Sequence, residues 1–161
     1  MDISIRRLEA TEIDEVVAVS LLAWEPVFQS LEQVLGSTIF RRLHPDWRSS
    51  QGEAVAGVCR AVETYTVWVA ERAAVIVGFV AYTLNHTDKI GEVYLMAVHP
   101  AHQNRGIGTA LNTFALDQLK ASGMLVAYVH TGGDPGHAPA RRSFEKVGYS
   151  SLPVVHYYQA L

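Results

Sequence analysis

The chain has 161 residues, of which 49% are hydrophobic and 18% charged, and its formal net charge is −3. This length and composition predict one folded domain over residues 1–161 and exclude a disordered chain. The weak negative charge gives no basic surface for nucleic acid or an anionic membrane, and no apolar run has the length of about 20 residues that a membrane helix needs. The single cysteine, Cys59, cannot form an internal disulfide, and no export signal is visible, so we expect a cytoplasmic protein.

The first part of the chain predicts one strand followed by a long helical region. Ile3 and Ile5 alternate with polar neighbours, which is typical of a strand. Apolar residues at helical spacing follow from Thr11, and we expect Pro26 to interrupt that helix. Helical spacing then resumes, so residues 24–60 are predicted to form a helical excursion between strands.

The rest of the chain predicts a sheet and a late strand–helix unit. Segments rich in β-branched and aromatic residues predict strands over 64–71, 75–84, 90–98, 124–130 and 149–159. Helices are predicted over 106–122 and 139–147. Successive strands joined by short turns pair antiparallel, so this order indicates an α+β fold.

Residues 92–109 carry the strongest functional signal. An apolar strand ends at Val98, a turn follows at His99–Pro100, and the segment from Gln103 to Gly108 opens the next helix. Glycines at such a start let the backbone approach a ligand closely. The first N–H groups of a helix lack intrahelical partners and lie at the positive end of its dipole, which predicts an anion-binding site.

Two elements of the sequence resemble the GNAT acetyltransferase superfamily. Gln103, Gly106 and Gly108 match its Gln/Arg-x-x-Gly-x-Gly/Ala loop, and residues 140–149 resemble its Asn-x-x-Ala-x-x-x-Tyr-Glu-Lys-x-Gly-Phe element. The resemblance covers nearly the whole chain. It implies a single GNAT-like domain with a mixed, mostly antiparallel central sheet flanked by helices, and a helical excursion after the first strand. It also implies acetyl-CoA as the acyl donor, with no metal.

The same resemblance implies a set of acetyl-CoA contacts. The strand backbone would pair with the pantetheine arm, the loop would wrap the pyrophosphate, and the Val98 N–H would serve the oxyanion. Two departures from the family pattern matter, because His137 stands where relatives often have Asn and Phe144 stands where many have a Tyr that protonates the leaving thiolate. The residues implied in cofactor binding are Met96, Ala97, Val98, Gln103, Asn104, Arg105, Gly106, Ile107, Gly108, Thr109, His137 and Arg141.

Glu92 is the candidate general base. It precedes Gln103 by eleven residues, the offset at which a glutamate base occurs in some GNAT relatives. It would act through water on the amine, or it would be an ordinary solvated or ion-paired carboxylate. In a regular strand, every second side chain points to the same face. The face toward the substrate would then carry Glu92, Tyr94, Met96 and Val98. Tyr94 would either orient the substrate or simply pack.

Other candidates lie farther from the loop. His130, at the end of a predicted strand, would either exchange a proton near neutral pH or serve as a structural hydrogen-bonding residue. Trp24, Glu25 and Phe28 would line an acceptor pocket, where Glu25 would favour a cationic amine. Core packing explains the two aromatic residues equally well.

The sequence therefore predicts an N-acetyltransferase that moves an acetyl group from acetyl-CoA to a primary amine by direct transfer in a ternary complex. A small-molecule amine is the preferred acceptor, and neither nucleic acid nor a membrane is expected as a partner. The alternatives are a protein N-terminal or lysine acetyltransferase and a non-catalytic acyl-CoA-binding module. Phe144 favours the last alternative and Glu92 opposes it. A homodimer is compatible with the resemblance.

Overall fold

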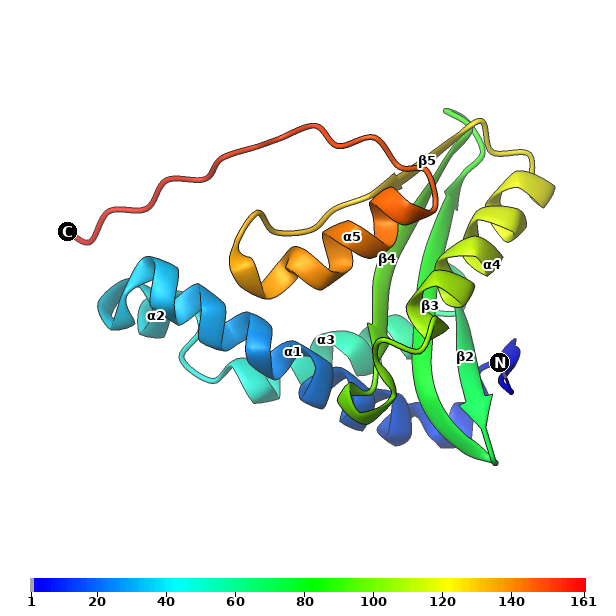
Figure 1. Ribbon diagram of the computed structural model, residues 1–161, viewed down its shortest axis with the longest axis horizontal. Coiled ribbons are helices and arrows are strands. Elements are labelled where there is room, and N and C mark those ends of the chain that lie inside the picture. Colours follow the sequence, from blue (N-terminus) through cyan, green and yellow to red (C-terminus); the bar gives the residue numbers. More distant parts are fainter. Residues whose placement is uncertain (1) are drawn as a thin grey trace.

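A five-stranded sheet forms the centre of the computed structural model, which describes residues 2–161 (Figure 1). The strands lie in the order in which they occur in the chain. The first four pair antiparallel with their neighbours, and the last pair is parallel. The strands are β1 (Ser4–Arg7), β2 (Thr66–Arg72), β3 (Val75–Asn85), β4 (Ile90–Val98) and β5 (Val126–Val129). The predicted α+β class and the mostly antiparallel sheet are confirmed.

Helices separate the strands at two places in the chain. Three of them form the predicted excursion between β1 and β2, and one connects β4 to β5, because parallel neighbours require a crossover. The helices are α1 (Ile13–Leu35), α2 (Ser37–Leu43), α3 (Trp47–Arg60), α4 (Ile107–Ala121) and α5 (Ala138–Lys146). Single turns of 3-10 helix are η1 (Ala10–Glu12), η2 (Pro100–His102) and η3 (Pro135–His137). Across residues 2–161, none of these helices is both long and apolar enough to cross a bilayer.

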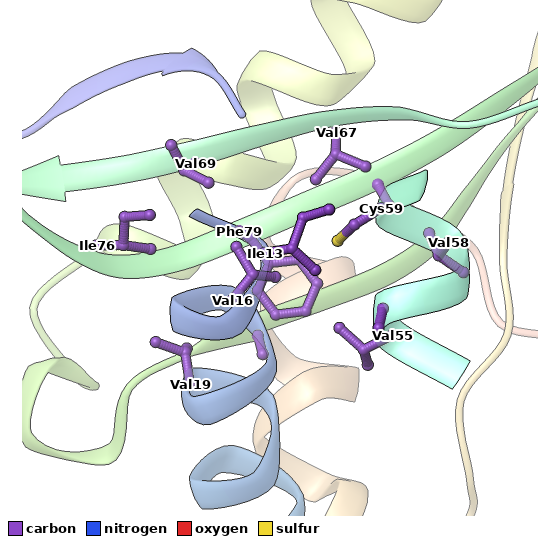
Figure 2. Close-up of a cluster of buried hydrophobic side chains, with 13 residues drawn as sticks. Ile13, Val16, Val19, Val55, Val58, Cys59, Val67, Val69, Ile76 and Phe79 are labelled. Atoms are coloured by element: carbon purple, nitrogen blue, oxygen red, sulfur yellow. The ribbon is translucent and has the colours of Figure 1, made fainter. Parts of the chain in front are cut away.

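The sheet is covered on both faces, and each face has its own core. On one face α1 and α3 pack against β2 and β3, with Val16 and Val55 fully buried beside Phe79 (Figure 2). Cys59 belongs to this cluster, and burial raises the pKa of its thiol to about 11. It is therefore a packed, neutral side chain rather than a reactive thiolate.

The opposite face of the sheet is covered by α4. Its residues Ile107, Leu111 and Leu119 are almost completely buried and contact the side chains of Val80 and Val93 in the second core cluster. Their spacing follows the helical period, as the sequence predicts. This packing fixes the position of the α4 N-terminus relative to β4.

Helix α1 continues through Pro26, so the predicted interruption there is wrong. A proline inside a helix removes one N–H from the hydrogen-bond ladder, but the helix can persist when tertiary packing holds both halves. Here Val16 and Val19 anchor the first half in the core, and Ser30 anchors the second half at a buried position. Tertiary contacts thus outweigh the local cost of the proline.

The predicted strands over 149–159 are also wrong, because residues 150–161 form no regular secondary structure. This segment is exposed along its length and runs away from the sheet (Figure 1). Within residues 2–161 no strand pairs with the outer edge of β5, where Val126 is 54% and Tyr128 46% exposed. The apolar alternation of the segment was a real signal, but strand formation also requires a partner.

Candidate functional site

A cavity of about 690 Å³ lies where α1, β4, the start of α4, the end of β5 and α5 meet. Its size falls within the range of small-molecule and cofactor sites, which is about 300–1,000 Å³. The side chains and backbone that line it come from Ala23, Trp24, Pro26, Val27, Val93, Tyr94, Leu95, Met96, Ala97, Val98, Gln103, Asn104, Gly106, Gly108, Thr109, Val129, His130, Thr131, Gly136, His137, Pro139, Ala140, Arg142, Ser143, Phe144 and Lys146.

The cavity opens where β4 separates from β5. The two strands pair only from Ile90 to Val93 of β4, so residues 94–98 have no strand neighbour on that side. The N–H of His99 donates to the carbonyl of Val77 on β3 at 2.9 Å. Because antiparallel pairing alternates along a strand, this bond directs the N–H groups of Met96 and Val98 away from β3 and toward the cavity.

A β-bulge at Tyr94 changes which side chains share a face of β4. Val93 lies opposite Tyr82 of β3 and Leu95 lies opposite Ala81, so Tyr94 is an extra residue. Val93, Met96 and Val98 contact the α4 core, whereas Leu95 and Ala97 contact the α1–α3 core. The prediction of one shared face for Glu92, Tyr94, Met96 and Val98 is therefore wrong, since a bulge shifts the alternation by one residue.

The loop between β4 and α4 has the geometry of an anion-binding turn. Asn104 and Gly106 have positive φ angles of 58° and 82°, and Gly106 is the N-cap of α4 without a capping side chain. The first N–H groups of α4 are therefore not occupied by a side-chain cap. Gln103 helps to fix the loop, because its side-chain amide donates to the Val98 carbonyl at 3.0 Å.

The loop residues predicted to bind the cofactor lie in three places: the main cavity, the core under α4 and a separate small cavity. Most of them line the cavity, as do Met96, Ala97, Val98 and His137. Ile107 is instead buried in the core under α4, and Arg105 lines a separate cavity of about 110 Å³ together with Asp2. The loop residues at the main cavity are Gln103, Asn104, Gly106, Gly108 and Thr109.

A buried amide fixes a hydroxyl group at the wall of the cavity. Asn112 of α4 is fully buried, and its Nδ2 donates to Oγ of Ser143 on α5 at 3.0 Å. The Oδ1 atom of Asn112 has no hydrogen-bond partner within residues 2–161. Sequence reasoning missed this pair, although a polar residue among the apolar positions of α4 was a visible signal.

The loop before α5 is held by an unusually dense set of hydrogen bonds. The carboxylate of Asp134 accepts from the Ser30 hydroxyl at 2.7 Å, from the Gly136 N–H at 3.0 Å and from Nδ1 of His137. Arg141 donates to the carbonyls of Gly132 at 2.6 Å and Asp134 at 2.8 Å. The guanidinium of Arg141, which the resemblance assigned to the cofactor, thus binds the protein's own backbone.

The same contacts determine the charge state of Asp134. Burial raises the pKa of this carboxyl, but the hydrogen bonds from Ser30 and His137 oppose it and leave the pKa below its usual range. The side chain is only 7% exposed. A carboxylate in this position is therefore ionised and fully engaged by donors.

Glu92 lies beside a pair of tyrosines. Tyr94 lines the cavity, and its ring centre lies 4.9 Å from that of Tyr65. Burial raises the pKa of the Tyr65 hydroxyl, and the hydrogen bond with Tyr94 and the charge of Glu92 raise it further. Glu92 is partly buried on the paired part of β4, opposite Thr83. Tyr65, which directly precedes β2, was not a candidate from the sequence, because only the folded sheet brings it to Tyr94.

The three predicted acceptor-pocket residues on α1 have different surroundings. Trp24 lines the cavity. The Glu25 carboxylate pairs with Arg48 at 2.5 Å, and the ring of Phe28 stacks on Trp47 with centres 4.4 Å apart. Glu25 and Phe28 therefore contact α3, while Trp24 contacts the cavity.

The ionisable groups of the cavity wall are mainly basic. Arg142 and Lys146 line it from α5, and two histidines line it, His130 and His137. No carboxylate from residues 2–161 is part of this wall. His130 lies at the end of β5, with Nδ1 3.2 Å from the Tyr128 hydroxyl. Excess positive charge suits an anionic ligand.

Phe144 also lines the cavity, and it is buried. Its ring contacts the edge of Tyr149 with centres 5.7 Å apart. Burial raises the pKa of the Tyr149 hydroxyl to about 12, so it stays protonated at neutral pH. In the part of the chain that the structure describes, no group of three or more His, Cys, Asp or Glu side chains is arranged to hold a metal ion.

The model of the acetyltransferase (GNAT) domain matches residues 63–151, which is more than half of the chain. The protein therefore belongs to the GNAT acetyltransferase family.

Individual relatives are also acetyltransferases. A mycothiol acetyltransferase of Thermomonospora curvata is 33% identical over 94 residues, which cover 58% of this chain and 31% of the relative. The chain thus spans less than a third of the length of the curated relatives it matches.

Solved structures match nearly the whole fold. The PaiA N-acetyltransferase of Thermoplasma acidophilum, in complex with coenzyme A, has a TM-score of 0.71 at 16% identity, covering 96% of this chain and 94% of that one. An aminoglycoside acetyltransferase from an uncultured soil metagenomic sample, in complex with sisomicin, has a TM-score of 0.61 at 20% identity, covering 99% and 96%.

The charge of Asp134 makes a testable contribution to stability. A carboxyl whose pKa is lowered by folding stabilises the protein above its unfolded pKa of about 3.9, and this contribution is lost as the pH falls through the folded value. We expect Asp134→Asn to have a lower free energy of unfolding than the wild type at pH 5 and above, and the difference to shrink below about pH 4. Urea unfolding of both proteins at several pH values measures this difference in the free energy of unfolding. A difference that does not change with pH would contradict the assignment.

Proposed function

We propose that this protein is an acetyl-CoA-dependent N-acetyltransferase that acylates a primary amine of a small molecule by direct transfer in a ternary complex. One observation carries the proposal. The N–H groups of Met96 and Val98 are directed into the same cavity of about 690 Å³ that the uncapped N-terminus of α4 enters at Gly106. An extended, amide-containing ligand that ends in a pyrophosphate needs both features at once.

The cavity suits the chemical groups of coenzyme A. Its pyrophosphate would bind the N–H groups at Gly106, Gly108 and Thr109, because a helix N-terminus favours anions. The amides of its pantetheine arm would pair with the free backbone edge of β4, as an added strand does. Arg142 and Lys146 would supply further positive charge. The volume of about 690 Å³ lies in the usual range of small-molecule sites and supports this proposal.

Acetyl-CoA would supply an activated acyl group whose thiol leaves readily. The Val98 N–H, held by the sheet, would donate to the oxygen on which negative charge develops, and a donor fixed in advance needs no reorganisation. Glu92 is not part of the cavity wall, so it would remove a proton from the acceptor's ammonium group through water, beside Tyr65 and Tyr94. Tyr94 and Trp24 would hold the acceptor at the cavity wall.

A small-molecule acceptor is supported by the position of α1. Trp24, Pro26 and Val27 form one wall of the cavity, so the helical excursion limits access from that side. Among the matching proteins, the mycothiol and aminoglycoside acetyltransferases are named for small molecules, whereas two solved structures are ribosomal-protein-alanine N-acetyltransferases. Acetylation of a protein N-terminus or lysine is the alternative that the next experiment distinguishes.

Release of free thiol from acetyl-CoA in the presence of candidate acceptors tests the proposal. The panel contains amino sugars and aminoglycosides, polyamines, amino acids and short peptides. We expect acceptor-dependent thiol release with a small amine and mass-spectrometric detection of the N-acetylated product. Release only with peptides would overturn the small-molecule assignment, and binding of acetyl-CoA without release for any member would favour a binding module.

Gly106 tests the anion site. An alanine at a φ of 82° is strained by about 1–2 kcal/mol, and relief of the strain would turn the first N–H groups of α4 away from the cavity. We expect Gly106→Ala to weaken coenzyme A binding about tenfold by isothermal titration calorimetry. Gly57→Ala is the matched control, because a Cβ there meets nothing within 4 Å. Equal affinities of the two variants would exclude the loop as the pyrophosphate site.

Glu92→Gln tests the base. The amide keeps the size of the side chain and removes the proton acceptor, so we expect kcat to fall about 100-fold while the KM for acetyl-CoA stays close to the wild-type value. Glu63→Gln, at an exposed turn position, serves as the control for loss of one charge. Unchanged turnover in Glu92→Gln across the pH range would remove Glu92 from the mechanism.

A further inference from the structure

We infer that His137, held by the buried carboxylate of Asp134, carries the reacting proton inside the cavity. It takes the proton of the attacking amine at Nε2 and gives it to the departing sulfur. The inference rests on the proposed function and adds to it a proton-transfer group, where the sequence had implied only a cofactor contact.

The tautomer of His137 is set by its neighbour. Nδ1 of the ring is hydrogen-bonded to Oδ1 of Asp134, a carboxylate that is only 7% exposed and that also accepts from Ser30 and Gly136. An ionised carboxylate can only accept, so the neutral imidazole must carry its proton on Nδ1. Its Nε2 atom then has a free lone pair. A carboxylate in this place also stabilises the imidazolium that forms when Nε2 takes up a proton.

The other nitrogen is available to a ligand. The His137 side chain is 20% exposed and lines the cavity, and among the described residues its ring is hydrogen-bonded only at Nδ1. Asp134 holds the ring at Nδ1, and the Ser30 hydroxyl and the Gly136 N–H in turn hold Asp134. The ring is thus fixed at one nitrogen and open at the other.

His137 is better suited to proton transfer than any other group of the wall. Side chains that exchange protons near neutral pH are histidines, and the cavity has two. His130 is paired with the hydroxyl of Tyr128, which is 46% exposed, so no buried charge fixes it. The remaining ionisable groups that face the cavity are Tyr94, Arg142 and Lys146, and none of them is a histidine.

The aromatic residues of α5 and its end do not compete for this role. Phe144 lines the cavity and has no proton to give. The Tyr149 hydroxyl beside it is protonated, but it is buried without a hydrogen-bond partner in the described chain and is not part of the cavity wall. A proton that must reach the sulfur is therefore best supplied by His137.

The proton balance of the transfer requires one such group. A neutral amine forms its N–C bond to the acyl carbon while the C–S bond breaks, so nitrogen must lose one proton and sulfur must gain one. His137 accepts the first at Nε2 and donates it to the sulfur, returning to its starting state. Glu92 acts earlier, on the ammonium form of the acceptor. Asp134 touches no reacting atom and is a positioning residue.

Two substitutions separate this role from a structural one. In His137→Asn, the amide Nδ2 can donate to Asp134 as Nδ1 does, so the loop is kept and only Nε2 is lost. In Asp134→Asn, the amide can donate toward the ring and favours a proton on Nε2, which reverses the tautomer. His86→Asn, in the exposed turn between β3 and β4, is the matched control. Circular dichroism and thermal unfolding establish that each variant folds.

The first readout needs no turnover. Nitrogen-15 NMR of histidine-labelled full-length protein should show neutral His137 protonated at Nδ1 in the wild type and at Nε2 in Asp134→Asn. The second readout titrates the thiol of bound coenzyme A by its ultraviolet absorbance. A nearby imidazolium stabilises the thiolate, so we expect the thiol pKa to be about one unit higher in His137→Asn than in the wild type.

Kinetics with the acceptor found in the panel complete the test. We expect His137→Asn to lower kcat about 100-fold with little change in the KM for acetyl-CoA, and Asp134→Asn to do the same. A wild-type Nε2–H tautomer, or a bound thiol that titrates identically in wild type and His137→Asn, would overturn the inference while the proposed function stands. Failure of the wild type to bind coenzyme A would overturn both.

Discussion

The hydrogen bonds between β4 and β5 end at Val93, and the rest of the site depends on this separation. Two parallel strands that stayed paired would use the N–H groups of Met96 and Val98 within the sheet. Their separation leaves those groups free, while β3 holds β4 from the other side. The extra residue at Tyr94 lies directly after the last pair, where a bulge locally increases strand twist. A binding edge therefore lies between two strands of the same sheet.

The walls of the cavity come from distant parts of the chain, and polar contacts hold them together. Ser30 of α1 binds Asp134 of the loop before α5, and Asn112 of α4 binds Ser143 of α5. These bonds tie α5 to both faces of the sheet. They are buried, so losing one partner would leave the other unsatisfied, at a cost of about 1–3 kcal/mol. The side of the cavity that carries the basic residues is thus rigid, although α5 itself is only nine residues long.

Local sequence signals were sufficient to predict the element order, the α+β class and the loop that opens α4. Glycines, a turn proline and helical spacing act over a few residues, so residues 92–109 could be interpreted directly. What could not be predicted depends on pairing at long range. The bulge at Tyr94 is a property of β3 and β4 together, Tyr65 reaches Tyr94 only through the sheet, and Asp134 acquires its role from Ser30. Two predictions were wrong for the same reason. Core packing keeps α1 helical through Pro26 despite the local effect of the proline, and residues 150–161 have no partner strand despite their apolar alternation.

The bond between Ser30 and Asp134 joins residues 104 positions apart. Contacts of such separation form late in folding, because the chain entropy of a long loop must be lost before they contribute. During synthesis, α1 leaves the ribosome well before the loop that carries Asp134 exists. The cavity therefore has no N-terminal precursor, and a nascent chain that already contains the whole of β4 and α4 still lacks one of its walls. The site is therefore complete only after the loop that carries Asp134 has packed against α1.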